Sequence, residues 1–266
     1  SAVSFDKELP ENNIVTIQPD SLRILHNPLT GWVLYASMGV DAADFWAQYD
    51  HMYIPELGHN VSVTDYAHTL YIRASWTDFN PQEDVYGWKI DSNLRAYIEG
   101  AYQRNMRLAF RVVVDSRDKR TEFTPQFVKD AGAKGFMNKG KWSPYSDDPI
   151  FKKYYTKFVK TLAKDFNDPS KVEFIDGFGL GKWGEYHTMI YSTGDDTPKK
   201  AVFDWVTDIY SQAFDKVPVV INYHRWIGAG KDWVDDEHFA ADSEEMLEEA
   251  IKKGYSLRHD AFGMTT

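Results

Sequence analysis

Residues 172–187 read Val-Glu-Phe-Ile-Asp-Gly-Phe-Gly-Leu-Gly-Lys-Trp-Gly-Glu-Tyr-His and carry the strongest signal of the fold. The apolar, glycine-punctuated part over 172–180 predicts a buried strand that leads into a Trp-Gly-Glu-Tyr-His cluster. Glu185 is therefore expected at the carboxyl end of a strand, among aromatic rings. In parallel α/β folds these ends carry the functional site, and a partly dry pocket raises the pKa of a carboxyl group. Glu185 is a candidate general acid, with a backbone cap or a surface ion pair as the alternative.

Apolar, β-rich segments recur along the chain, and a helical pattern follows most of them. Strands are expected at 31–37, 69–76, 107–115, 172–180, 217–223 and 255–260. Helices are expected at 41–53, 90–104, 148–166, 199–214 and 243–253. The helix over 148–166 has Asp148 as a capping residue and Pro149 early in its first turn. This alternation is typical of parallel βα units.

The pattern predicts an α/β fold of the (β/α)8 TIM-barrel class, with the chain covering roughly its first six βα units. Residues 1–30, with three prolines and little periodicity, are expected to form an extended lead-in, and 31–266 to form the barrel domain. The Lys- and Gly-rich segment 116–146 is expected to be a long loop over a strand's carboxyl end. Since such a barrel has eight units, we expect the polypeptide to continue for at least two more. A smaller open α/β fold is the alternative.

The composition narrows the classes of function. A net charge of −10 and a pI near 5.3 argue against a nucleic-acid partner and favour a neutral ligand. Aromatic residues make up 15% of the chain, which suits the apolar faces of sugars, although most of these rings are expected in the core. No run of 18 apolar residues predicts a membrane span. The N-terminus lacks a signal-peptide pattern, so we expect an exported chain whose signal peptide has been removed, with a cytoplasmic protein as the alternative.

Metal and cofactor motifs are missing from the sequence. It contains no cysteine and neither a His-x-His nor a His-Glu-x-x-His motif, so we expect no metal. The glycines of 177–184 precede Glu-Tyr-His, where a dinucleotide site would need a helix to receive the pyrophosphate. We therefore expect no cofactor.

Other candidate side chains share the expected strand-end position. Arg73 and Arg111 lie on buried strands, where a guanidinium needs a partner, so each is expected to support Glu185 or to bind substrate. We expect the strand ends to meet at one rim. The further candidates for substrate binding, each with packing or an ion pair as the alternative, are Trp76, Asp115, Trp183, His187, Asn222, His224, Trp226 and Asp260.

The segment 70–91 carries a resemblance to a known family. It reads Leu-Tyr-Ile-Arg-Ala-Ser-Trp-Thr-Asp-Phe-Asn-Pro-Gln-Glu-Asp-Val-Tyr-Gly-Trp-Lys-Ile-Asp. It resembles Arg…Trp…Glu-Pro-x-x-Gly-x-Tyr-x-Trp…Ile-Asp, which follows the second barrel strand in retaining glycoside hydrolases of the large (β/α)8 clan, such as the barrel-type β-galactosidases. Trp183-Gly184-Glu185 then falls where that clan keeps its acid/base. A closer likeness is to bacterial domains with a Gly-x-Trp-Gly-Glu fourth strand that are suspected of being glycoside hydrolases. Asn80, Asp84 and Gly184 depart from the pattern, because the clan usually has Glu, Gly and Asn there.

The resemblance implies a hydrolase of glycosidic bonds in an oligo- or polysaccharide. It implies general acid/base catalysis by Glu185 with retention of configuration. The clan's nucleophile is a Glu at the end of the seventh strand, which is expected beyond Thr266, and Asp260 is the best second carboxylate within the chain. The alternatives are a noncatalytic carbohydrate-binding protein on the same scaffold and, behind it, a metal-free lyase or isomerase. The sugar, the linkage and the oligomeric state do not follow from the sequence.

Overall fold

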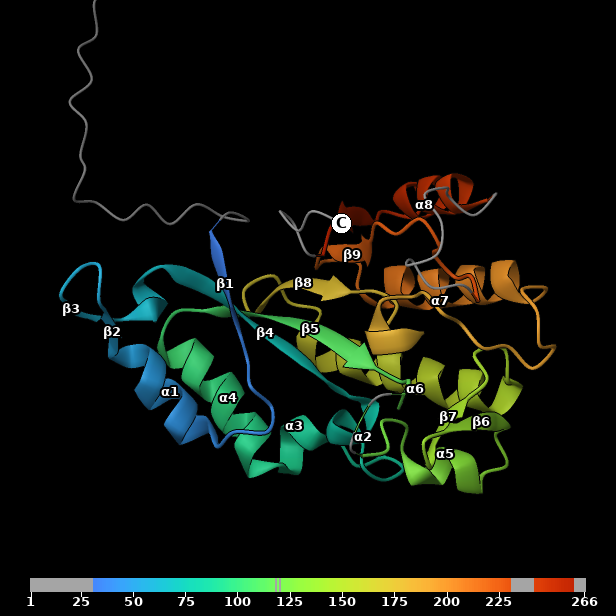
Figure 1. The fold of residues 1–266 in the computed structure, drawn as a ribbon, viewed down its shortest axis with the longest axis horizontal. Helices are drawn as coiled ribbons and strands as arrows, with labels where there is room; N and C mark the ends of the chain where they lie inside the picture. The colour runs from blue at the N-terminus through green and yellow to red at the C-terminus, as the bar shows by residue number, and fades with distance from the viewer. Residues whose placement is uncertain (1–30, 118, 120, 231–241, 261–266) are drawn as a thin grey trace, which may run out of the picture.

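A six-stranded parallel sheet forms the centre of the computed structural model, which describes residues 31–117, 119, 121–230 and 242–260 (Figure 1). Its strands stand in the order β1-β4-β5-β8-β9-β10, which follows the chain, and each neighbouring pair is parallel. The strands are β1 (Trp32–Tyr35), β4 (Ala67–Ser75), β5 (Arg107–Val113), β8 (Val172–Asp176), β9 (Val219–Asn222) and β10 (Ser256–Arg258). This is the topology of a (β/α)8 barrel, of which the described residues form six units. The predicted strands are confirmed.

Helices connect the strands, as βα units require (Figure 1). The longer ones are α1 (Ala42–Asp50), α4 (Ser92–Gln103), α6 (Pro149–Phe166), α7 (Lys199–Ala213) and α8 (Ser243–Lys252), which confirms the five predicted helices. At the start of α6 the Asp148 carboxylate accepts hydrogen bonds from the amides of Ile150 and Phe151, and Pro149 is the first helical residue. None of the helices in the described ranges is long and apolar enough to cross a membrane.

Shorter elements occupy the connections. They are the helices α2 (Trp76–Phe79), α3 (Gly87–Ile90) and α5 (Gln126–Asp130), and the 3₁₀ turns η2 (Val63–Asp65) and η3 (Lys182–Gly184). Two antiparallel hairpins join β2 (Met52–Ile54) to β3 (His59–Val61) and β6 (Gly135–Asn138) to β7 (Lys141–Pro144). The segment 116–146, predicted as a long loop, is the connection between β5 and α6, and it contains α5 and the β6–β7 hairpin. Lys139 and Gly140 both have positive φ, at 48° and 78°, which is the backbone shape of a tight two-residue hairpin turn.

Strand β8 ends earlier than the sequence predicts. The expected strand ran over 172–180, but the sheet pairing stops at Asp176. Gly179 and Gly181 have φ near 74°, in the left-handed region, so the chain leaves the extended conformation there. Glu185 consequently lies in a loop, well past the last residue of the strand. The predicted lead-in over 1–30 lies outside the described residues.

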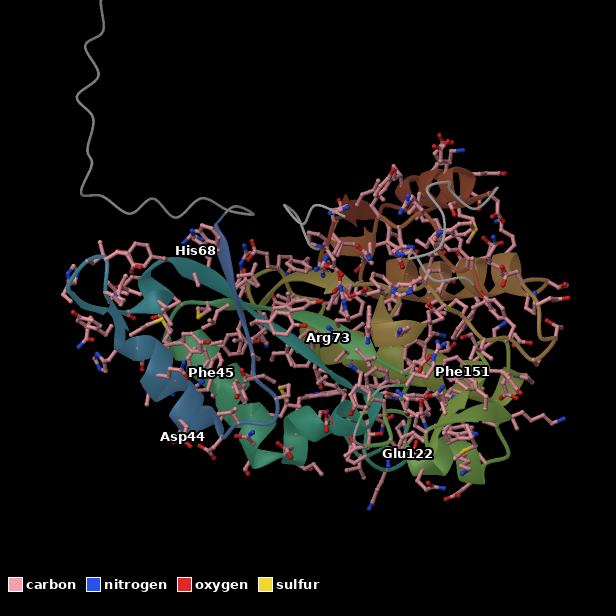
Figure 2. All side chains as sticks on the ribbon, in the orientation of Figure 1. Asp44, Phe45, His68, Arg73, Glu122 and Phe151 are labelled. Atoms are coloured by element: carbon pink, nitrogen blue, oxygen red, sulfur yellow. The ribbon has the colours of Figure 1, made fainter. Side chains whose placement is uncertain are left out.

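Side chains fill the space between the sheet and its helices (Figure 2), and many of the buried ones are aromatic. Trp76 follows β4 directly, but Ser75 caps α2 there, which turns the indole into the helical layer. The Trp76 ring is 0% exposed and packs edge-on against Phe151 and Tyr155, at centroid distances of 6.0 and 5.2 Å. The ring therefore packs in the core, which was the alternative to its predicted contact with substrate.

Replacement of this indole provides a test of the core. We expect Trp76→Ala to lower the free energy of unfolding by about 3–5 kcal/mol, because a large buried side chain leaves a cavity. Trp32→Ala is the matched control, since Trp32 is 76% exposed on β1 and its loss is expected to cost less than about 0.5 kcal/mol. Urea unfolding followed by circular dichroism measures both. Equal losses in the two variants would contradict the core assignment.

Candidate active site

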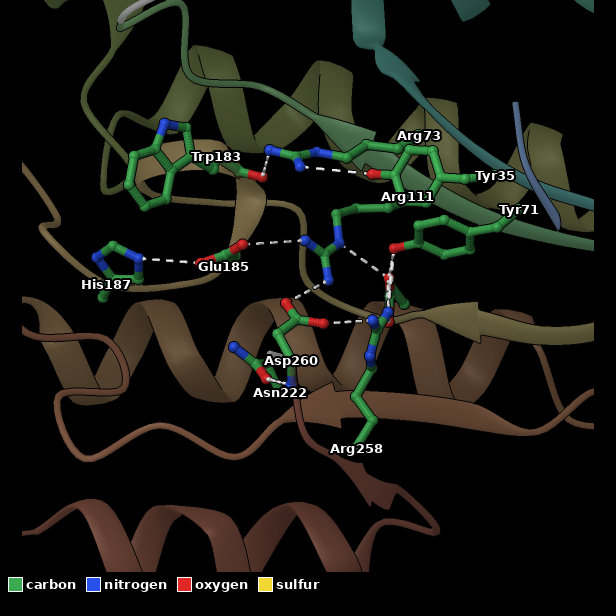
Figure 3. Close-up of polar contacts among 11 residues, drawn as sticks. Tyr35, Tyr71, Arg73, Arg111, Trp183, Glu185, His187, Asn222, Arg258 and Asp260 are labelled. Carbon is green, nitrogen blue, oxygen red and sulfur yellow. Dashed lines mark hydrogen bonds and ion pairs between the residues drawn. The ribbon is translucent and has the colours of Figure 1, made fainter. Parts of the chain in front are cut away.

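Glu185 lies in the loop between β8 and α7, directly after η3, with both carboxylate oxygens held (Figure 3). Its Oε1 lies 3.6 Å from Nη1 of Arg111, and its Oε2 lies 3.3 Å from Nε2 of His187. The side chains of Arg111 and His187 are 2% and 0% exposed, whereas that of Glu185 is 21% exposed. The carboxylate is therefore fixed from the protein side and remains accessible to a ligand.

The backbone around Glu185 adopts an uncommon conformation. Trp183, Tyr186 and Thr188 have φ of 58°, 66° and 51°, in the left-handed region that residues with a side chain rarely adopt. Such residues concentrate at functional sites, where the surrounding structure holds them in place. Gly184 also has positive φ, and a Cβ there would lie 3.0 Å from a methyl group of Val113. A side chain at this position would add that close contact to the strain of positive φ, which favours glycine.

Arg111 joins Glu185 to two aspartates. Its Nε donates to Asp176 at 2.9 Å and its Nη2 to Asp260 at 3.0 Å. Arg258 pairs with the same two aspartates, and the Tyr71 hydroxyl donates to Asp176. We call these five residues, together with Glu185, the Arg111 cluster. Because Asp176 and Arg111 are almost fully buried, each requires the other's charge.

The cluster shifts the pKa values of its members. Burial favours the neutral acid at Asp260, but the charges of Arg111 and Arg258 outweigh it and lower the pKa of Asp260. Burial opposes the charge of Arg111, but Asp176 above all raises the pKa of that guanidinium. Burial and then the charge of Asp176 raise the pKa of Tyr71 well above its usual value, so its hydroxyl remains a donor. Asp260 is thus ionised at neutral pH.

Two further arginines hold the backbone on either side of Glu185. Arg73, on β4, donates from Nη2 to the carbonyl oxygen of Trp183 at 2.8 Å (Figure 3). Arg117 donates from Nη2 to the carbonyl oxygen of Thr188 at 2.5 Å. Asp115 accepts from Arg117 at both carboxylate oxygens, so it supports the loop through that arginine. The contacts seen for Arg73 and Asp115 are thus to the protein, and their predicted substrate contacts remain predictions.

Aromatic and amide side chains complete the surroundings of Glu185. The imidazole rings of His187 and His224 stack with centroids 4.6 Å apart and planes 12° from parallel, and Trp183 meets His187 edge-on at 5.8 Å. Buried Asn222 accepts from the backbone amide of Asp260 at 3.3 Å. Trp226 is 7% exposed. Most of the predicted site residues thus lie together in one region, and the role of each in binding stays a prediction. They are Arg73, Arg111, Trp183, Glu185, His187, Asn222, His224 and Asp260.

Sequence reasoning did not single out Asp176, Tyr71, Arg117 or Arg258. Asp176 had a usable signal, because it is a carboxylate that ends an apolar strand, as Glu185 was expected to do. For Arg258 the sequence offers one signal, its position two residues before Asp260. In the part of the chain that the structure describes, no three His, Cys, Asp or Glu side chains are grouped as metal ligands would be.

The fold and site define a (β/α) barrel with a carboxylate at its strand-end rim. Three solved structures to which the chain is similar are xylanase B from Clostridium stercorarium F9, endo-glycoceramidase II from Rhodococcus sp. and GH10 from Paenibacillus barcinonensis. The TM-scores are 0.47, 0.46 and 0.48 at 14%, 13% and 13% identity. The matches cover 85%, 84% and 85% of this chain and 60%, 60% and 58% of those chains, so the chain spans about three fifths of their length. No family model matches the sequence, and no curated protein matches it.

The lowered pKa of Asp260 gives a pH-dependent stability. Its ion pairs stabilise the fold above about pH 4, the unfolded value, and this contribution is lost as the pH falls through the lower folded value. We expect Asp260→Asn to lose about 1–3 kcal/mol at pH 7 and to show a flatter decline between pH 5 and 2 than the wild type. Asp130→Asn, at an exposed carboxylate on α5, is the control. Denaturant unfolding at each pH checks this, and parallel curves for D260N and wild type would contradict it.

Gly184 offers a test of the close approach of the loop to β5. We expect Gly184→Ala to destabilise the protein, because a Cβ there adds a 3.0 Å contact with Val113 to the cost of positive φ. Gly58→Ala is the matched control, since Gly58 has φ of 69° and a Cβ there would meet nothing within 4 Å. The control is expected to cost about 1–2 kcal/mol, and G184A at least about 1 kcal/mol more. Thermal unfolding compares them, and equal shifts would contradict the packing argument.

Proposed function

We propose that this protein is a glycoside hydrolase in which Glu185 is the general acid/base. The observation that carries the proposal is the geometry of Glu185, whose accessible carboxylate is oriented by the buried side chains of Arg111 and His187. Cleavage of a glycosidic bond needs a carboxyl group that gives a proton to the leaving oxygen. An oriented carboxylate at the strand-end rim of a barrel suits this role.

Glycoside cleavage also needs a second carboxylate. In retaining enzymes it lies about 5 Å from the acid and attacks the sugar, and in inverting enzymes it lies further away and activates water. Asp260 is the candidate within the described residues, because it shares Arg111 with Glu185 and is ionised. The family resemblance instead assigns the nucleophile to a later strand and implies retention. We propose retention on the strength of that resemblance.

The proposed substrate is a neutral oligo- or polysaccharide. The net charge of −10 disfavours a polyanion, and Trp183 stands beside the site with its ring meeting that of His187. Tyr35 and Tyr223, which end β1 and follow β9, are 49% and 40% exposed and offer apolar faces to a sugar. We also propose that the enzyme is exported from the cell to act on such a polymer.

A noncatalytic sugar-binding role is the second candidate, and one observation favours it. Asp176 and Asp260 are each paired with both Arg111 and Arg258. Their charges are thus already balanced, which leaves less freedom for either to attack a sugar or to activate water. In this alternative Glu185 accepts a hydrogen bond from a sugar hydroxyl.

Glu185→Gln tests the two candidates. The amide keeps the shape but cannot deliver a proton, so we expect kcat on natural oligosaccharides to fall about 10²–10⁴-fold while binding is retained. Glu99→Gln, at an exposed glutamate on α4, is the control and is expected to behave as the wild type. The assays are hydrolysis of xylo-, cello-, manno- and galacto-oligosaccharides and calorimetric titration with the same sugars.

A second series compares leaving groups. The loss in E185Q should shrink on aryl glycosides with acidic leaving groups, which need little proton donation. Turnover in E185Q equal to the wild type would exclude Glu185 as the acid. Sugar binding without turnover in the wild type would favour the noncatalytic role.

A further inference from the structure

Arg111 is a buried side chain that contacts the Glu185 carboxylate from the protein side. Its side chain is 2% exposed, and its Nε, Nη1 and Nη2 face three different carboxylates. A guanidinium is planar and always charged, so a fixed guanidinium fixes the directions of all its partners.

The position of this guanidinium is itself determined by the protein. Asp176 and Asp260 bind it at 2.9 and 3.0 Å, and the rings of Tyr71 and Phe178 lie 5.9 and 5.7 Å from its central carbon. The contact with Glu185 is longer, at 3.6 Å. The two aspartates therefore locate Arg111, and Glu185 adapts to it.

The distribution of charges in the cluster also makes Arg111 the arginine that orients Glu185. The Arg111 cluster holds two arginines and three carboxylates, and Arg258 contacts Asp176 and Asp260. Among the ion pairs of the described residues, Arg111 is the arginine that reaches Glu185. The loop also passes close to this side chain, because a Cβ at Gly184 would lie 3.4 Å from Cδ of Arg111.

We infer that Arg111 is the positioning residue that sets the direction of the Glu185 carboxylate, from a place fixed by Asp176 and Asp260. This inference rests on the proposed acid/base role of Glu185. Loss of the three-way contact would leave Glu185 in the site but misdirected, which lowers turnover more than binding. A misplacement of about 1 Å at a reacting group costs up to about 10²-fold in rate.

Arg111→Lys, with Arg258→Lys as the matched control, separates positioning from stability. Both variants keep the charge and lose the fork toward the same two aspartates, and only the first removes a contact with Glu185. We expect kcat on the best-cleaved oligosaccharide of the panel above to fall about 10–100-fold in R111K with KM within about threefold. The loss in R258K should be at least tenfold smaller at a comparable fall in Tm. Equal kcat losses in the two would overturn the inference.

A double-mutant cycle tests the coupling. In the E185Q background R111K should cost less than about threefold in turnover, because the group it directs no longer transfers a proton. Additive losses would overturn the inference. Full activity in E185Q would instead overturn the proposed function, whereas a loss in E185Q with none in R111K would overturn only the positioning role.

A crystallographic comparison needs no turnover. In R111K the Glu185 carboxylate should be displaced or spread over several conformations, and in R258K it should keep its place beside His187. An unmoved Glu185 in R111K would overturn the inference. If R111K does not fold, Asp260→Asn serves the crystallographic comparison, because it keeps the charge of Arg111 and weakens one of the two contacts that place it; an unmoved Glu185 carboxylate in D260N would then overturn the inference.

Discussion

The burial of one guanidinium charge constrains the whole site. Arg111 lies on β5 in the middle of the sheet, where an unpaired charge would be too costly to keep. Its partners come from β8 and from the residues that follow β10, so the charge is balanced only when these strands have assembled. The same pairing brings Glu185 to the rim. Electrostatic balance in the sheet and orientation of the candidate acid thus depend on the same contacts.

The loop that carries Glu185 is held by three arginines. Arg73 binds its backbone at Trp183, Arg117 binds it at Thr188, and Arg111 binds the carboxylate between them. Positive φ values at residues with side chains cost free energy, so without these contacts the loop would adopt a more common backbone conformation. The charge-assisted bonds to Trp183 and Thr188, on either side of Glu185, offset that cost and stabilise this uncommon backbone conformation.

Buried tyrosines satisfy the start of the same loop. Tyr255 donates to the carbonyl oxygen of Gly177 at 2.6 Å, and Tyr155 donates to that of Phe178 at 3.2 Å. These carbonyls leave the sheet where β8 ends and need other partners, because an unpaired buried acceptor is destabilising. Burial raises the pKa of Tyr255 and Tyr155, so both hydroxyls stay protonated donors. Tyr155 on α6 and Tyr255, which precedes β10, thereby fix the path that leads to Glu185.

The sequence by itself determined the elements and the leading candidate. Periodicity and capping signals are local, so they predicted the strands and the longer helices. They placed Glu185 at a strand end, whereas β8 stops at Asp176 and Glu185 lies in the loop that follows. Only the tertiary structure decided the partners, because Arg111 meets Asp176 and Asp260 across 65 and 149 positions of the chain. It also decided that Trp76 lies in the core. Ser75 caps α2, so the strand ends one residue earlier than predicted and Trp76 begins a helix. Contacts between distant segments depend on the order and register in which the strands pair, and no local sequence pattern specifies these.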